Sequence, residues 1–124
     1  MAETINAKEL MLSLRQHTCT EFYHEHRTIG NIKVLLTDGV HYLREKAQCY
    51  WLVDVILSWQ YKLHKESFQV WSIKKIGNKG WDIIAEDGNK KQLVFQRISY
   101  SDFPVEDGII LYYNEGVLML PSEY

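Results

Sequence analysis

The chain has 124 residues, of which 46% are hydrophobic, 13% aromatic and 24% charged, and its formal net charge is -2. A chain of this length is expected to form one domain, residues 1–124, whose core needs neither disulfides nor a structural metal. The charge makes a nucleic-acid binder unlikely, because such proteins usually carry a basic face. No segment has the pattern of a signal peptide or a membrane span, so we expect a cytoplasmic protein without membrane contact.

The N-terminal third predicts a helix followed by a hairpin. Asn6 and Glu9 have the spacing of a capping box, and apolar residues at helical spacing follow them, which predicts a short helix over residues 7–16. Polar and apolar residues then alternate over 18–27 and again over 32–36, with a Gly-Asn turn signal between the two stretches. This pattern is typical of a two-stranded hairpin.

The most apolar run of the chain, Ala47–Trp59, predicts a central buried helix that carries a single charge, Asp54. Apolar residues recur at helical spacing from Val40 onwards. One helix from Val40 to Tyr61 would be roughly 35 Å long, which is long for a domain of this size. We therefore expect a bend or break near residues 46–48.

The C-terminal half has the alternation of β-strands. The predicted strands are Phe68–Ile76, Trp81–Glu86, Gln92–Tyr100, Ile109–Tyr113 and Val117–Leu120. Short turns join most of them, which favours antiparallel neighbours. The expected fold class is α+β, with the central helix packed against an antiparallel meander of about five strands, an N-terminal helix and an additional hairpin.

Several short motifs together resemble a known family. They are L-T-D-G-V-x-Y-L (Leu36–Leu43), Y-W-L-x-D-x-I (Tyr50–Ile56) and the closing L-P-S-E-Y (Leu120–Tyr124). Their order and spacing resemble an uncharacterised family of short bacterial, plasmid and phage proteins, classed as a domain of unknown function, over about residues 14–124. The resemblance implies a small cytoplasmic accessory protein of mobile-element origin, and it implies no catalytic residue.

Asp54 is the first candidate for chemistry. A carboxylate on a mostly buried helix must be hydrogen-bonded, paired or neutralised. Two alternatives follow: Asp54 fixes the orientation of the helix, or it is a general base or metal ligand that works with His41, Asp38 or the His24/His26 pair. The structural role is favoured, and Asp38 also fits a helix cap, as does Thr37.

His24 and His26 would share one face of a strand, as two metal ligands require. The third ligand would be His41, His17 or Asp38. No third ligand has a characteristic spacing, so two exposed histidines are favoured over a metal site, and no cofactor is expected.

The aromatic residues suggest a surface for binding. Tyr112 and Tyr113 lie on opposite faces of their strand, and Trp71 and Trp81 add large rings to the sheet. One sheet face must cover the helix. The other is either an interaction or dimer surface formed by these residues, or is covered by the N-terminal helix and the hairpin.

The leading functional hypothesis is a non-enzymatic protein-interaction or inhibitor protein that binds another protein or a second copy of itself. It would act on a host defence protein, as an anti-CRISPR-like inhibitor does, or on a replication protein. The alternative is a small metal-dependent hydrolase that uses Asp54 and nearby histidines. Binding of nucleic acid, the third hypothesis, would need a contiguous Lys/Arg face.

Overall fold

The computed structural model describes residues 6–17, 22–28, 31–63, 65–78, 80–101, 103–105 and 107–124. The helices are α1 (Ala7–Arg15), α2 (Asp38–Lys46), α3 (Tyr50–Ser58), α4 (Gln60–Leu63) and a 3-10 helix, η1 (Pro121–Glu123). The strands are β1 (His24–Thr28), β2 (Ile32–Leu36), β3 (Phe68–Ile76), β4 (Gly80–Asp87), β5 (Gln92–Ile98), β6 (Ile109–Asn114) and β7 (Val117–Met119). Within these residues no helix is long and apolar enough to cross a membrane.

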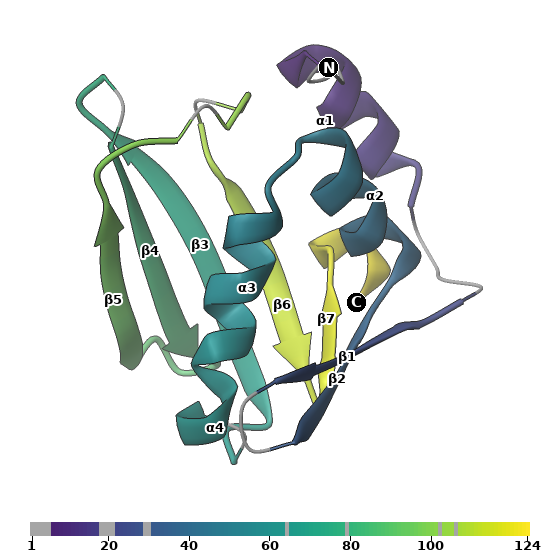
Figure 1. Ribbon diagram of the computed structural model, residues 1–124, viewed down its shortest axis with the longest axis vertical. Helices are drawn as coiled ribbons and strands as arrows, with labels where there is room; N and C mark the ends of the chain where they lie inside the picture. Colours follow the sequence, from purple (N-terminus) through teal and green to yellow (C-terminus); the bar gives the residue numbers. More distant parts are fainter. Residues whose placement is uncertain are drawn as a thin grey trace.

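The strands form one seven-stranded sheet in the order β1-β2-β7-β6-β3-β4-β5, and α3 lies across one of its faces (Figure 1). The core is built from alternate residues of the strands, which point towards α3. Among the fully buried side chains are Trp71 from β3, Trp81 and Ile83 from β4, and Leu52 and Ile56 from α3. The predicted α+β class and the packing of a central helix on the sheet are confirmed.

The predicted break in the central helix is confirmed. The helix ends at Lys46 and starts again at Tyr50. Gln48 has a φ of 52°, in the left-handed region that stops an α-helix. The break lets α2 lie beside the end of the sheet while α3 packs on its face (Figure 1).

The order of the strands differs from a simple meander. β3, β4 and β5 pair in sequence, but β6 pairs with the other side of β3 instead of with β5. The segment between β5 and β6 is a long loop, not a tight turn, and its residues Phe103 and Val105 are buried. The loop can therefore pass over the end of the sheet, with Phe103 packed edge-to-face on Trp81 at 5.5 Å between ring centroids.

The predicted hairpin forms β1 and β2, and it joins the same sheet because β2 pairs in parallel with β7. The predicted start of its first strand, residues 18–21, lies outside the described residues. The N-terminal helix is confirmed: the side chain of Asn6 accepts a hydrogen bond from the backbone N–H of Glu9 at 2.9 Å.

A buried amide pair ties α4 to the sheet. The side chains of Gln60 and Gln69 are fully buried and exchange two hydrogen bonds, at 2.9 and 3.0 Å. The indole N–H of Trp71 donates to the Gln69 Oε1 at 2.8 Å, which orients the Trp71 ring in the core. Buried polar groups need such partners, so this network fixes the position of the helix on β3.

Candidate interaction surface

The face of the sheet that points away from α3 carries a row of apolar side chains on β4, β5 and β6, with Ser72 of β3 between them. In the ladder, Phe95 of β5 pairs with Ile84 of β4, which pairs with Ser72 of β3, which pairs with Ile110 of β6. We call this side of β3–β6 the open face. In the described part of the chain it is accessible: Phe95 is 49% and Ile110 is 47% exposed.

Three aromatic rings extend the open face towards η1. The rings of Phe68, Tyr112 and Tyr124 contact one another pairwise, with centroids 5.4 to 5.5 Å apart. We call them the aromatic triad. Tyr124 remains 70% exposed, so the triad presents a ring to solvent.

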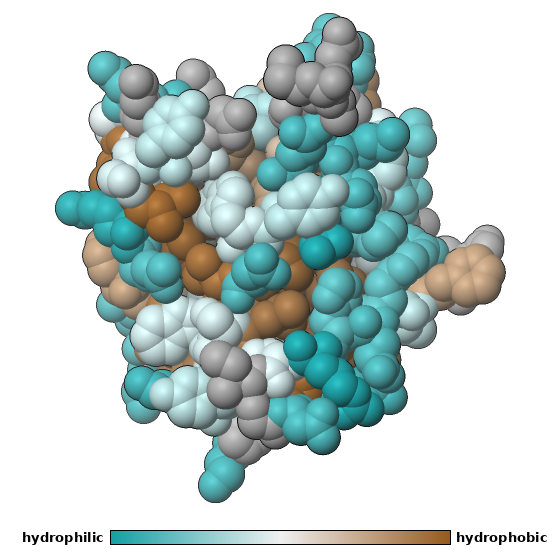
Figure 2. All heavy atoms as spheres, in the orientation of Figure 1, coloured by the Kyte–Doolittle hydropathy of each residue, from teal (hydrophilic) through white to brown (hydrophobic). Residues whose placement is uncertain are grey.

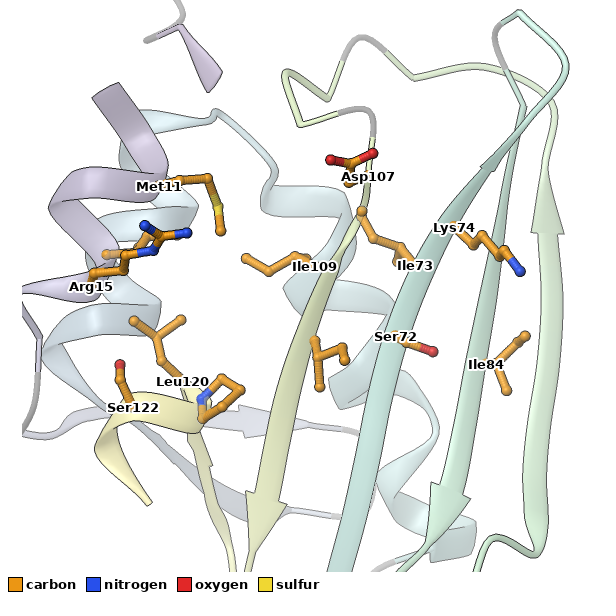
Figure 3. Close-up of a pocket in the computed structure, with 14 residues that line it drawn as sticks. Met11, Arg15, Ser72, Ile73, Lys74, Ile84, Asp107, Ile109, Leu120 and Ser122 are labelled. Atoms are coloured by element: carbon orange, nitrogen blue, oxygen red, sulfur yellow. The ribbon is translucent and has the colours of Figure 1, made fainter. Parts of the chain in front are cut away.

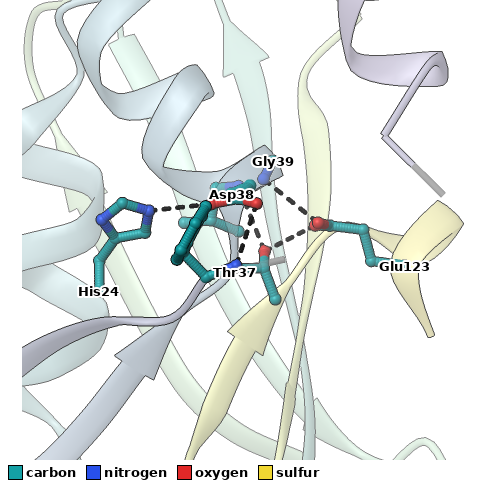
Figure 4. Close-up of polar contacts among 7 residues, drawn as sticks. His24, Thr37, Asp38, Gly39 and Glu123 are labelled. Atoms are coloured by element: carbon teal, nitrogen blue, oxygen red, sulfur yellow. Dashed lines mark hydrogen bonds and ion pairs between the residues drawn. The ribbon is translucent and has the colours of Figure 1, made fainter. Parts of the chain in front are cut away.

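Glu123 holds the C-terminal segment in place (Figure 4). Its Oε1 accepts hydrogen bonds from the Thr37 hydroxyl at 2.6 Å and from the Leu120 N–H at 3.0 Å. Its Oε2 accepts from the N–H of Gly39 at 3.2 Å, at the N-terminus of α2. A carboxylate is favourable there because the first N–H groups of a helix have no partner within the helix, and the N-terminal end of the helix dipole is positive. The contact positions η1 and hence the triad.

A groove of about 590 Å³ lies where α1 and η1 meet the open face (Figure 3). Its apolar lining comes from Met11, Leu14, Ile73, Ile84, Ile109, Ile110, Leu120 and Pro121, and its polar lining from Arg15, Ser72, Lys74, Asp107 and Ser122. In Figure 3 the side chains of Met11 and Arg15 point into the groove from α1. This volume and mainly apolar lining are typical of a binding site.

Charged residues border the apolar row. Arg97 donates two hydrogen bonds to Asp82 on the neighbouring strand, at 2.7 and 3.2 Å. This bonding from Arg97 lowers the pKa of the Asp82 carboxyl from its usual value. The Arg97 guanidinium also lies 5.6 Å from the centroid of the Phe95 ring. The opposite side, which carries α3, shows hydrophobic atoms mostly in recesses between more hydrophilic residues (Figure 2).

Three of the predicted metal or catalytic residues meet where β1 passes α2. The rings of His24 and His41 stack with centroids 4.0 Å apart, and the Nε2 of His24 lies 3.0 Å from an Asp38 carboxylate oxygen (Figure 4). Burial, followed by Arg44 and His41, lowers the pKa of His26. Within the described residues, no three His, Cys, Asp or Glu side chains are arranged to hold a metal ion.

The remaining predicted polar residues have structural positions. Thr37, not Asp38, caps α2, because its hydroxyl accepts from the Val40 N–H at 3.3 Å. The Nδ1 of His17 lies 3.1 Å from the Ser13 carbonyl oxygen, a contact within α1 and its C-terminal end.

The expectation that Asp54 must be hydrogen-bonded, paired or neutralised is wrong. Asp54 is exposed, because the side of α3 that carries it faces away from the sheet. The buried residues of α3 are Leu52, Val53, Ile56 and Leu57, so the helix is amphipathic despite its apolar sequence. An exposed carboxylate is solvated by water and needs no buried partner.

Comparison with known proteins gives the family. A family model described as "Family of unknown function (DUF6876)" matches residues 8–124. The chain belongs to this family. The match confirms the resemblance to an uncharacterised family, with a start slightly earlier than residue 14. No curated protein and no solved structure matches the chain.

Most of the residues that the sequence predicted for an interface lie in the core. Trp71, Trp81 and Tyr113 are 1%, 0% and 3% exposed, because their positions in the alternation face α3. These three are therefore corrected to core residues. Tyr112 lies on the open face.

Sequence reasoning missed Phe95, Ile110 and Tyr124 as surface residues. Phe95 and Ile110 lie on the same side of the sheet as Tyr112, so a correct strand register would have found them. The position of Tyr124 depends on the Glu123 contact with α2, for which the sequence carries no local signal.

Proposed function

We propose that this protein is a non-enzymatic interaction protein that binds a protein partner through the open face. The observation that carries the proposal is the accessible row of Phe95, Ile84 and Ile110, which is continued by the aromatic triad and adjoins an apolar groove. Exposed apolar patches bordered by polar residues mark protein–protein interaction sites.

The composition of the surface supports binding. Tyrosine rings are enriched among the residues that contribute most to binding energy, and Tyr112 and Tyr124 are next to each other in the triad. Charged pairs such as Asp82–Arg97 beside the apolar row resemble the polar rim of an interface. The apolar row would supply the affinity, and the charged border the orientation.

The resemblance to short phage and plasmid proteins extends the proposal to the class of partner. A protein of mobile-element origin would bind a host defence or replication protein and inhibit it. Its net charge of -2 favours a basic groove on the partner as the surface that it occupies.

The test is affinity capture from a bacterial host lysate with the wild type and a Phe95→Ser/Tyr124→Ser variant. We expect a partner that the wild type retains and the variant loses at least about tenfold, because both rings are exposed and contribute mainly to binding. The matched control is Leu12→Ser/Tyr61→Ser, which also removes two exposed apolar side chains, 52% and 48% exposed, but outside the open face. Equal capture by both variants would contradict the proposal.

Sedimentation of the purified protein distinguishes a second copy from a different protein. If the wild type is a dimer that the Phe95→Ser/Tyr124→Ser variant converts to a monomer, the partner is another copy of this chain. If the wild type is a monomer, the captured protein is the partner.

A second candidate function is the metal-dependent hydrolase. The observation that favours it is the proximity of Asp38, His24 and His41, in which a carboxylate oxygen lies 3.0 Å from one imidazole and the second imidazole stacks on that ring. These side chains would have to rearrange to bind a metal ion. It would use His24 and His41 together with Asp54, which is exposed on α3. Zinc bound by the wild type and lost on His24→Ala, measured by elemental analysis, would favour this function.

A further inference from the structure

The edge of β6 that faces β7 is paired with another strand along only half of its length. It pairs with β3 from Ile109 to Asn114, but β7 pairs only with Tyr112–Asn114. The chain leaves the sheet after Met119 and turns into η1 at Pro121, where Glu123 holds it. In the described chain, no strand therefore lies beside Ile109–Leu111 on the side where β7 would continue.

The backbone of Ile110 points into this unfilled position. The carbonyl oxygen of Leu118 accepts a hydrogen bond from the Thr37 N–H, just after β2. The backbone N–H and C=O groups of Leu118 therefore point towards β2, and those of its neighbour Met119 point towards β6. Met119 is opposite Tyr112, which makes this a hydrogen-bonded pair. Because the direction alternates along a strand, Tyr112 and Ile110 offer their N–H and C=O groups to the same side.

The groove occupies the position that a longer β7 would fill. Ile109 and Ile110 form one wall, Leu120 and Pro121 form the end where β7 stops, and Met11 on α1 closes the side. An unpaired strand edge beside apolar side chains is a template for another extended chain. The vacant stretch spans about 10 Å, the length of a three-residue strand.

The charge of the groove favours an acidic occupant. The Arg15 guanidinium points into it (Figure 3), and no ion pair of Arg15 occurs among the described residues. Among the described residues, Lys74 and Asp107 also line the groove. An acidic side chain could pair with Arg15 without breaking an ion pair to any described residue.

We propose that the groove binds a short extended segment of the partner protein, which adds as a strand beside Ile110. The segment has apolar side chains at alternate positions, directed at Met11 and Leu120, and an acidic residue next to Arg15. Backbone pairing gives affinity and the alternate side chains give specificity, as in other cases of strand addition. This inference rests on the proposed function, because it names the part of the partner that is recognised.

The probe is a phage-displayed library of linear heptapeptides, selected on the wild type. We expect enrichment of sequences with alternating apolar residues and an Asp or Glu, bound with a dissociation constant in about the micromolar range. Fluorescence polarisation with the best synthetic peptide should show at least about fivefold weaker binding to Arg15→Glu and nearly unchanged binding to Arg15→Lys. Lys90→Glu, in the turn between β4 and β5, is the matched charge control.

Two further measurements test the strand pairing itself. N-methylation of the peptide backbone, one position at a time, should weaken binding at least about tenfold only at the residue that donates to Ile110, because a methyl group removes that donor. Hydrogen exchange of the Ile110 amide should slow by at least about tenfold when the peptide is bound. The N-methyl series leaves the protein unchanged, so it remains decisive even if Ile110→Pro, the variant without the N–H, does not fold.

Binding that is insensitive to N-methylation, an unprotected Ile110 amide or no enriched peptide would overturn the inference. So would a groove occupied by a second copy of the chain in sedimentation, or by a co-purified acyl ligand in native mass spectrometry. If capture of the partner depends on Phe95 and Tyr124 but no peptide binds the groove, the inference fails while the proposed function stands.

Discussion

Replacement of Glu123 by alanine should destabilise the fold although the residue is next to the C-terminus of the chain. The change removes the three hydrogen bonds from Thr37, Gly39 and Leu120. Bonds to a charged group contribute about 1.5–3 kcal/mol when buried. Because Glu123 is half-buried and water can replace part of each bond, we take about 1 kcal/mol for each, which gives a loss of about 3 kcal/mol. The melting temperature should fall by about 10 °C.

Urea unfolding followed by tryptophan fluorescence measures the loss. Glu123→Gln is the matched control: it keeps the size and one acceptor oxygen but sets an NH₂ group against an N–H donor, so about half of the loss is expected. A double-mutant cycle with Thr37→Val should give a coupling of about 1 kcal/mol. A Glu123→Ala variant within about 0.5 kcal/mol of the wild type would refute the assigned role of the contact.

Three further variants test the interior. Gly39→Ala should lower the free energy of unfolding in urea by about 2 kcal/mol, because the added Cβ would lie 2.5 Å from Leu120 Cδ1 and from a Glu123 oxygen. A gain in stability, which is the usual result of this change in a helix, would contradict the packing. Gln69→Leu should cost about 3 kcal/mol by leaving buried donors and acceptors without partners, whereas exposed Gln92→Leu should cost less than about 0.5 kcal/mol; similar losses would count against the amide network. Burial raises the pKa of the Cys49 thiol to about 12, so in a Cys19→Ser background a disulfide reagent at pH 8 should react only after unfolding, and fast reaction with the folded protein would disprove the burial.

Local features of the fold were predictable because their signals are local. Asn6 caps α1 as its sequence suggests, and the helix breaks at Gln48 within the expected interval. Strand positions followed from alternation. The pairing of β6 with β3 was not predictable, because the loop that contains Phe103 and Val105 permits either neighbour and only packing decides between them.

The candidate site was predictable in kind and not in detail. Aromatic residues on both faces of the sheet were evident, but alternation does not say which face a helix covers. The side of the sheet on which α3 packs therefore decides which of the two residues, Tyr112 or Tyr113, is buried in the core. Asp54 illustrates the same limit, since an apolar sequence hides which side of a helix faces solvent.

The short strand β7 also has a consequence for folding. Within the described strands, β7 alone joins the hairpin of β1 and β2 to the rest of the sheet, through the pairs Leu35–Val117 and Leu36–Leu118. These contacts link residues that are far apart in the sequence. Until the ribosome has released Val117–Met119, β2 and β6 both keep an unpaired edge, so the nascent protein exposes two edges that are prone to aggregation. The sheet therefore closes only once β7 is available, and its long-range pairs favour slow folding.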